Sequence, residues 1–244
     1  MVERETVDRR IETEKIGGSV IRIVQSGDTL HAIAFASGLD VNELAAWNNL
    51  SDTSKLNIGQ RIRLTKPLNY KPTSVARRST QTRTETAGAK RQTSNVPEQT
   101  QTAQPARRSS SRSARENQRL QNELGWRWPV RGRVINGFSS RQSPQGIDIA
   151  AAKNTPVLAA APGEVVYVGN GLKGYGNLVI IKHNDQYLSA YAHNHSTYVS
   201  EGQKVFSQTS IGSIGNNKQG VTALQFQIRR HGQPVNPLLY LPNR

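Results

Sequence analysis

The stretch TALQFQIRR, residues 222–230, alternates apolar and polar side chains with the two-residue period of a β-strand. The apolar face, which is expected to meet a core, carries Leu224, Phe226 and Ile228. The opposite face carries Ala223, Gln225, Gln227 and Arg229. The pattern predicts a strand with one buried face and one polar face.

This strand lies in a region, residues 126–244, that is expected to be all-β. Runs rich in Val, Ile and Tyr recur there, and Gly, Pro and Asn separate them. Further strands are expected in GEVVYVGN (163–170), NLVIIKHN (177–184) and YLSAYAHN (187–194). Turn signals that recur about every ten residues are typical of an antiparallel sandwich or barrel-like sheet.

A smaller βααβ domain is expected at residues 20–65. Its first strand alternates Ile21 and Ile23 with Arg22. Asp28 or Thr29 then caps a helix that ends at Gly38.

A second helix follows from Val41 to Asn48-Asn49. The stretch NIGQRIRL returns as a strand, with Ile58, Ile62 and Leu64 expected to point inward. The whole chain is therefore expected to be of the α+β class.

The two domains are joined by a basic stretch, residues 66–115, that is expected to be disordered. It holds eleven Lys and Arg against two Glu, within a chain whose net charge is +15. It is rich in Ser, Thr, Gln and Pro and cannot bury enough apolar area to offset the entropy of ordering. No nucleic-acid-binding module accompanies the charge, so a solvated tether attracted to an anionic polymer or membrane surface is favoured over nucleic-acid binding.

Other features limit the function classes. The chain has no cysteine, which excludes disulfides and thiolate metal sites. No apolar run approaches the roughly 20 residues that span a bilayer. Residues 1–19 are expected to be a tail without the apolar core of a signal peptide, so export would require a signal peptide that is not in this sequence. Residues 116–125 could form a short helix, with Leu120 and Leu124 one turn apart.

Three segments of the small domain, VQSGDTLHAIA, NELAAWNNL and LNIGQRIRL, resemble a LysM domain in order and spacing. The resemblance implies binding of N-acetylglucosamine-containing glycan, such as peptidoglycan, between two loops. By position, these loops contain Gly27, Asp28, Thr29, Leu30, Leu56, Asn57 and Ile58.

The large domain resembles the LytM-type zinc endopeptidases, relatives of lysostaphin, from QGIDIAAAKNTPV through QPVNPLLYL. That resemblance implies zinc held by His-x-x-x-Asp and by the second His of His-x-His, with other histidines assisting. Here only Asp148 and the Tyr191-x-His193 pair remain. The histidine positions are occupied by Pro144, Ala223 and Gln225, and the family's glutamate by Gln227.

The metal-ligand count argues against a zinc enzyme. A catalytic zinc site usually has three protein ligands, and one of the expected three is present. Without zinc, no water is brought to a pKa of about 7 for hydrolysis. The alternative is a non-standard site built from His193, His195 and Asp148, although NHSTY indicates a turn that would leave His195 in solvent. We therefore expect no catalytic residue, no metal and no cofactor.

A degenerate LytM domain after LysM and a polar linker resembles the NlpD-like activators of N-acetylmuramoyl-L-alanine amidases. The resemblance implies a monomeric, non-enzymatic, periplasmic lipoprotein, anchored in the outer membrane, that binds peptidoglycan and activates an amidase during daughter-cell separation. The groove expected to contact the amidase contains Gln145, Asp148, Tyr175, His183, Tyr191, His193, Gln225, Gln227 and Arg229.

Arg229, Tyr175 and Gln225 are the expected partner contacts in that groove, because arginine and aromatic side chains dominate interface energetics. Two other hypotheses remain open at this point: an active endopeptidase, and a purely structural wall-binding protein. A regulated activator is a further variant, in which residues 114–125 fold over the groove.

Overall fold

The computed structural model describes residues 13–16, 19–51, 56–67, 70, 124–139, 145–217 and 219–243. Most of the expected linker and residues 116–123 of the expected short helix lie outside the described residues. Leu124 and Gly125 form a turn.

The small domain has the expected βααβ unit with one strand added in front of it. Its strands are β1 (Thr13–Ile16), β2 (Ser19–Ile23) and β3 (Arg61–Arg63), in the order β1-β2-β3. The helices α1 (Leu30–Ser37) and α2 (Val41–Trp47) lie between β2 and β3 in the chain. The segment 1–19, expected to be only a tail, therefore contains a strand, because Thr13–Ile16 pair with β2.

Short polar contacts fix where α1 begins and ends. Thr29 is the N-cap, since its side chain accepts a hydrogen bond from the Ala32 amide at 3.1 Å. Gly38 ends the helix in the left-handed region, with a φ of 66°. Both boundaries agree with the sequence pattern, and they leave α1 as a short rod of eight residues.

Two side chains of the small domain are placed differently from the pattern. Arg22 is buried while Ile21 and Ile23 are only half-buried, because the guanidinium forms two-pronged hydrogen bonds with the Asp28 carboxylate at 2.8 to 3.2 Å. Ile58, expected to point inward, is 74% exposed. It lies in a turn closed by the Gln60 amide donating to the Asn57 carbonyl at 3.0 Å, so the strand begins only at Arg61.

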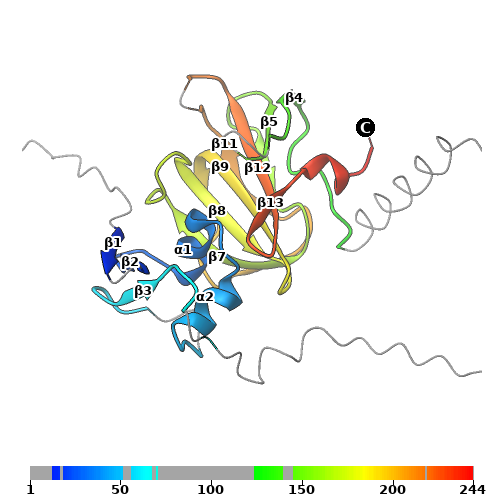
Figure 1. Ribbon diagram of the computed structural model, residues 1–244. Coiled ribbons are helices and arrows are strands. Elements are labelled where there is room, and N and C mark those ends of the chain that lie inside the picture. Colours follow the sequence, from blue (N-terminus) through cyan, green and yellow to red (C-terminus); the bar gives the residue numbers. More distant parts are fainter. Residues whose placement is uncertain are drawn as a thin grey trace, which may run out of the picture.

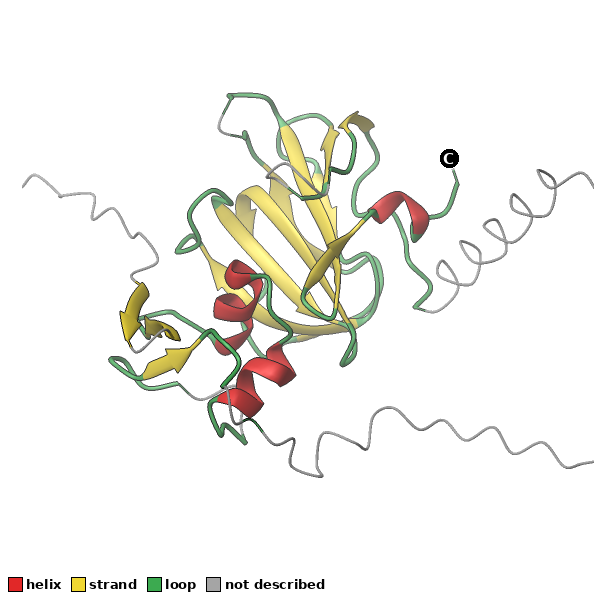
Figure 2. Cartoon of the chain, viewed as in Figure 1, coloured by secondary structure: helices red, strands yellow, loops and turns green. Residues whose placement is uncertain are grey.

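The large domain is one antiparallel sheet, as Figure 2 shows. Its strands are β4 (Arg133–Asn136), β5 (Ile147–Ala150), β6 (Pro156–Leu158), β7 (Gly163–Gly169), β8 (Asn177–Lys182), β9 (Tyr187–Thr197), β10 (Lys204–Val205), β11 (Ser210–Ile214), β12 (Ala223–Arg230) and β13 (Gln233–Val235). A 3-10 turn, η2 (Pro237–Leu239), follows them. The main strand order is β10-β7-β8-β9-β12-β5-β4.

The four strands expected from sequence are present as β7, β8, β9 and β12. β9 runs on to Thr197, so the turn expected at NHSTY is absent, although His195 is exposed as expected. The left-handed backbone of His193, with a φ of 62°, interrupts the regular alternation of this strand.

Opposite faces of the large sheet pack against different partners. Leu224, Phe226 and Ile228 lie in the main core, as their alternation predicts, together with Trp126, Tyr187 and Tyr240. The other face meets the small domain: Ala32 and Phe35 of α1 join a cluster with side chains of β7, β8 and β9. Figure 1 shows α1 lying across the sheet at β7 and β8.

We predict that Phe226→Ala lowers the free energy of unfolding by about 3–5 kcal/mol, because the ring is fully buried in the main core and the vacated space cannot fully collapse. The matched control is Phe206→Ala, since that ring is 79% exposed and should change stability by less than about 0.5 kcal/mol. Denaturant unfolding measures both. Equal effects would contradict the assigned core.

Candidate functional site

The candidate site is the sheet face opposite the main core, which we call the groove face. Direct cross-strand partners point to the same side of a sheet. Gln225 lies opposite Ala192 of β9 and Asp148 of β5. Gln227 lies opposite Ala190, and Arg229 opposite Leu188. The groove face thus includes Asp148, Gln225, Gln227, Arg229, Leu188, Ala190 and Ala192.

The positions that correspond to zinc ligands do not provide a zinc site. Ala223 is buried and has no donor atom. Gln225 offers an amide in place of an imidazole, and the Asp148 carboxylate accepts a hydrogen bond from Asn136 Nδ2 at 2.8 Å. Pro144 lies outside the described residues. Within the described part of the chain, no group of three His, Asp or Glu side chains is placed to hold a metal, which includes the proposed set of His193, His195 and Asp148. These residues do not fit a zinc centre.

Gln225 is the most unusual polar group on the groove face. Its side chain is 2% exposed, and neither its amide nitrogen nor its amide oxygen has a hydrogen-bond partner among the described residues. The amide nitrogen of Gln227 is in the same condition. Buried polar groups without partners cost about 1–3 kcal/mol each, so this part of the face would gain from a partner that donates and accepts hydrogen bonds.

Arg229 is 4% exposed and is held by carbonyl and amide oxygens. Its Nη1 donates to the Phe35 carbonyl at 2.6 Å and to the Gly232 carbonyl at 3.3 Å. Its Nε and Nη2 lie 3.4 and 3.3 Å from Gln227 Oε1. Burial lowers the pKa of the guanidinium, and the nearby Tyr175 opposes that shift.

Tyr175 lies on the β7–β8 loop, between Gly174 and Gly176, both of which have positive φ. Its ring meets the Phe35 ring edge-on, with centroids 5.4 Å apart. Its carbonyl accepts a hydrogen bond from the His193 amide at 2.8 Å, which ties the loop to β9. Gln145, half-buried, lies just before β5 and is separated from it by Gly146.

Two expected groove residues lie on the other side of the sheet. Tyr191 opposes Phe226 and belongs to the main core, where its hydroxyl accepts a hydrogen bond from the Ala160 amide at 2.8 Å. Tyr191 faces the core because it pairs with the apolar face of β12. Tyr191 and His193 were expected to share one face of the strand, but the left-handed backbone of His193 breaks the alternation between them.

His183 also lies on the core side. Its Nδ1 is 2.7 Å from the Pro162 carbonyl, and its Nε2 is 2.7 Å from Ser189 Oγ. The Trp126 ring meets it edge-on at 4.8 Å. Burial lowers the pKa of His183 to about 4, and the hydrogen bond to Pro162 opposes this shift. His183 is therefore a structural histidine rather than a groove contact.

The expected glycan-binding loops differ in accessibility. Leu30 is fully buried in the small core, Asp28 is paired with Arg22, and Thr29 caps α1 while its hydroxyl donates to the Val166 carbonyl at 3.2 Å. Leu56 is partly buried against the small core. The exposed members are Gly27, Asn57 and Ile58.

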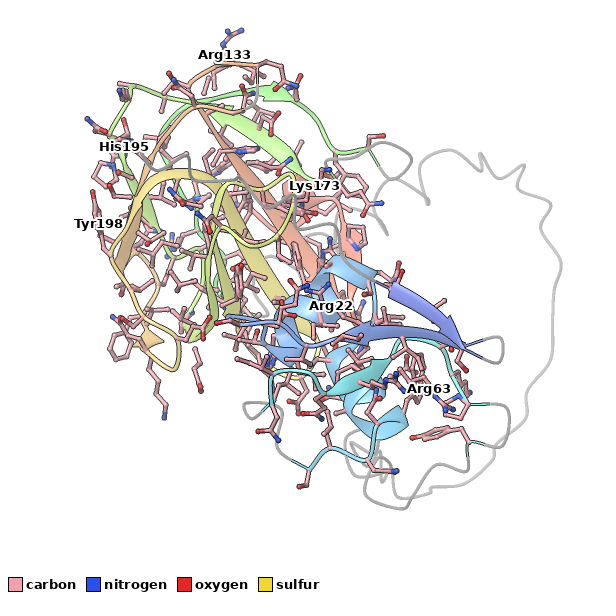
Figure 3. The ribbon with its side chains drawn as sticks, turned by 90° about the vertical axis from the view of Figure 1, so that its left-hand side faces the viewer. Arg22, Arg63, Arg133, Lys173, His195 and Tyr198 are labelled. Atoms are coloured by element: carbon pink, nitrogen blue, oxygen red, sulfur yellow. The ribbon has the colours of Figure 1, made fainter. Side chains whose placement is uncertain are left out.

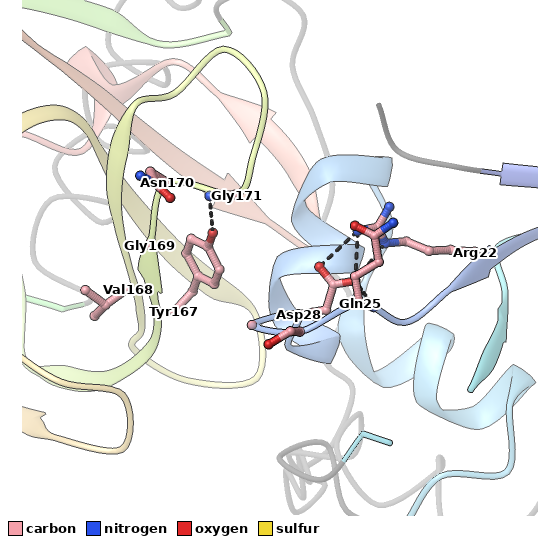
Figure 4. A pocket seen from close by; sticks show the side chains of 10 residues that line it. Arg22, Gln25, Asp28, Tyr167, Val168, Gly169, Asn170 and Gly171 are labelled. Carbon is pink, nitrogen blue, oxygen red and sulfur yellow. Dashed lines mark hydrogen bonds and ion pairs between the residues drawn. The ribbon is translucent and has the colours of Figure 1, made fainter. Parts of the chain in front are cut away.

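A pocket lies between the first of these loops and the peptidase-like domain (Figure 4). On one side are Arg22 and the 25–28 turn, and on the other is the chain from Tyr167 to Gly171. The Tyr167 hydroxyl accepts a hydrogen bond from the Gly171 amide at 3.1 Å. In Figure 3, Arg22 lies among the elements of the small domain, whereas His195 and Tyr198 lie at the far edge of the sheet.

The contacts of α1 were not evident in the sequence. Every residue from Leu30 to Phe35 is buried. A helix that is apolar on all sides is expected to pack against other elements on more than one side. This pattern is the sequence signal that could have predicted the contact of α1 with the large sheet. Leu30, Ile33 and Ala34 pack in the small core, whereas Ala32 and Phe35 pack on the large sheet.

Comparisons with known proteins agree with this two-part architecture. The model for peptidase family M23 matches residues 142–237, and the model for the LysM domain matches residues 23–65. The chain is 36% identical to the murein hydrolase activator NlpD of Escherichia coli (strain K12), over 91% of this chain and 67% of that protein. It is 40% identical to the lipoprotein NlpD/LppB homolog of Pseudomonas aeruginosa, over 91% of this chain and 77% of that protein.

The outer membrane antigenic lipoprotein B of Histophilus somni is 39% identical, over 87% of this chain and 64% of that relative, so the chain spans less than two thirds of its length. Among solved structures, a zinc containing peptidase from Vibrio cholerae is 24% identical with a TM-score of 0.42, over 45% of this chain and 37% of that one. Helicobacter pylori Csd3 is 28% identical with a TM-score of 0.43, over 49% of this chain and 33% of that one.

The fold and the matched models define a LysM domain joined to a peptidase family M23 domain. The chain belongs to the NlpD family, in which several relatives are named murein hydrolase activators.

We predict that Tyr191→Phe lowers the free energy of unfolding by about 1–3 kcal/mol, because the buried Ala160 amide loses its acceptor. Thermal or denaturant unfolding measures the change. The matched control is Tyr198→Phe, since Tyr198 is 57% exposed. A Tyr191→Phe protein as stable as the parent would contradict the core placement of this hydroxyl.

We also predict that His31, on α1, makes stability depend on pH. Burial and the charge of Lys182 on β8 lower its pKa from 6.5 to about 4. Because the unfolded chain then binds more protons, the stabilisation is present above pH 6.5 and is lost as pH falls towards 4. An NMR titration of the His31 ring gives its pKa. His31→Gln should reduce the loss of stability between pH 6.5 and 4, while the part of that loss caused by His183 remains. A His31 pKa near 6.5 would contradict the buried placement.

Proposed function

We propose that this chain is a non-enzymatic activator of N-acetylmuramoyl-L-alanine amidases in daughter-cell separation, held at peptidoglycan by its LysM domain. The proposal is supported by the polar side chains that β12 and β5 place on one face of the sheet, where Ala223 and Gln225 correspond to metal-binding histidines by the resemblance to LytM-type peptidases. Relatives named murein hydrolase activators support the same role.

The groove face offers the features that a protein partner would use. Arg229 provides five N–H donors in a planar fork, and Tyr175 provides a ring on a loop. The Gln225 amide, unpartnered among the described residues, can both donate and accept, and the unpartnered amide nitrogen of Gln227 can donate. Central aromatic and arginine side chains usually dominate binding energy, so these residues are the proposed amidase contacts.

The LysM domain is the proposed peptidoglycan tether. Gly27, Asn57 and Ile58 are exposed on its two loops and are its proposed sugar contacts. A tether of this kind raises the local concentration of the groove at the cell wall without adding specificity. We place the protein in the periplasm as a lipoprotein, a proposal supported by relatives that carry lipoprotein in their names. Within the described residues, no helix has the length and apolarity needed to span a membrane.

We predict that the chain releases no dye from labelled peptidoglycan by itself and increases release when a candidate amidase of the same cell is present. Arg229→Glu should reduce that stimulation at least tenfold, because it reverses the charge of the central anchor; a tenfold change corresponds to about 1.4 kcal/mol of binding free energy. Arg230→Glu is the matched control, since this neighbour is exposed and points to the opposite face.

Added zinc provides a second arm of the same assay. Zinc-dependent release by the chain alone would contradict the non-enzymatic proposal and would direct attention to His193, His195 and Asp148. Absence of stimulation with every amidase of the cell would contradict the activator role and leave a wall-binding function.

A further inference from the structure

The groove face is already covered within this chain. Helix α1 of the LysM domain lies on it, and Ala32 and Phe35 pack against apolar side chains of the peptidase-like domain. These side chains come from β7, the β7–β8 loop, β8 and β9: Tyr167, Leu172, Leu178, Ile180, Leu188, Ala190 and Ala192. Ala192, a member of the same cluster as Ala32 and Phe35, is the direct cross-strand neighbour of Gln225.

Phe35 is the centre of this contact. Its side chain is 1% exposed, and the Arg229 guanidinium carbon lies 3.7 Å from the centroid of its ring. Its edge-on contact with Tyr175 and the hydrogen bond from Arg229 to its carbonyl complete the site. The two residues expected to anchor an amidase, Arg229 and Tyr175, are therefore both occupied by one residue of the LysM domain.

Contacts at the rim fix the orientation of the cover. Gln233 Nε2 donates to the Gly38 carbonyl at 2.6 Å, and Asn42 Nδ2 lies 3.5 Å from the Asp185 carbonyl. The Leu39 carbonyl approaches Gly232 so closely that a Cβ at that position would collide with it. The approach is specific, because a side chain at position 232 would prevent it.

The closed arrangement gives the Arg229 guanidinium no carboxylate and the Gln225 amide no partner among the described residues, which makes it exchangeable. Arg229 is buried among carbonyl and amide oxygens, and none of the ion pairs of the described residues pairs it with a carboxylate. The Gln225 amide has no partner within the described residues. A ligand that brought a carboxylate and amide groups to this face would satisfy both, so α1 is a cover that a better partner can displace.

We propose that the LysM domain is the resting-state cover of the amidase-contact groove, with Phe35 as the plug that an amidase must displace. The proposal rests on the proposed function of the groove. It assigns the regulatory role to α1, whereas the sequence suggested residues 114–125, of which 114–123 lie outside the described residues. When the groove is covered in most molecules, its apparent affinity for a partner equals the affinity of the open form multiplied by the fraction of molecules that are open.

The first test replaces the plug in the full chain. Phe35→Lys places a cation beside the Arg229 guanidinium and should open the cover, while Phe35→Leu, the matched control, keeps an apolar plug. Phe35→Lys should bind and stimulate the amidase with an apparent affinity at least about tenfold higher than the parent chain, and Phe35→Leu should stay within about threefold. Adding Arg229→Glu to Phe35→Lys should abolish the gain. Equal affinities for the parent chain and Phe35→Lys would overturn the proposal.

The second test locks the cover. The chain has no cysteine, so Asn42→Cys with Asp185→Cys creates a single pair across the contact. Oxidation of this double variant should form a disulfide and lower amidase stimulation at least tenfold, and reduction should restore the stimulation. Adding Phe35→Lys should slow formation of the disulfide. An oxidised protein as active as its reduced form would overturn the cover.

The two tests separate the cover from the function of the groove. If neither the parent chain nor Phe35→Lys stimulates an amidase, the proposed function fails. Closure of the disulfide, and its slowing by Phe35→Lys, would then still report whether α1 covers the groove face.

Discussion

A buried guanidinium joins the two halves of this protein. Arg229 reaches from β12 to the Phe35 carbonyl of α1 and lies over the Phe35 ring, so one side chain holds both the polar and the apolar part of the contact. Burying such a cation costs free energy unless each donor is met, and here the donors are met by main-chain carbonyls and by Gln227. The arrangement of the LysM domain on the sheet depends on this interaction.

The same interaction gives the groove face a protein contact to organise it. In our proposal, Ala223 and Gln225 take the places of metal-binding histidines on this sheet. Arg229 and Tyr175 form an aromatic and cationic surface a short distance along the strands. The face is therefore organised around a protein contact, first with α1 and, in our proposal, with an amidase.

Periodicity predicted most of the fold. The core face of β12, the boundaries of α1 at Thr29 and Gly38, and the four central strands follow from local pattern and capping chemistry. Local pattern failed where a contact with another segment decided the outcome. Arg22 is buried because of Asp28 in the following turn, and β1 forms because β2 offers an edge. Tyr191 faces the core because it opposes Phe226, which is far away in the chain. The docking of α1 lies beyond local pattern for the same reason, since its partners are far away in the chain.

The most direct test of the account is hydrogen–deuterium exchange of the full chain with and without an amidase that it stimulates. The account predicts that amides of Leu30–Ser37 exchange faster when the amidase is bound, because α1 leaves the groove face, while amides of β8, β9 and β12 stay protected. Unchanged protection of α1 in a complex that forms on the same sheet would contradict it.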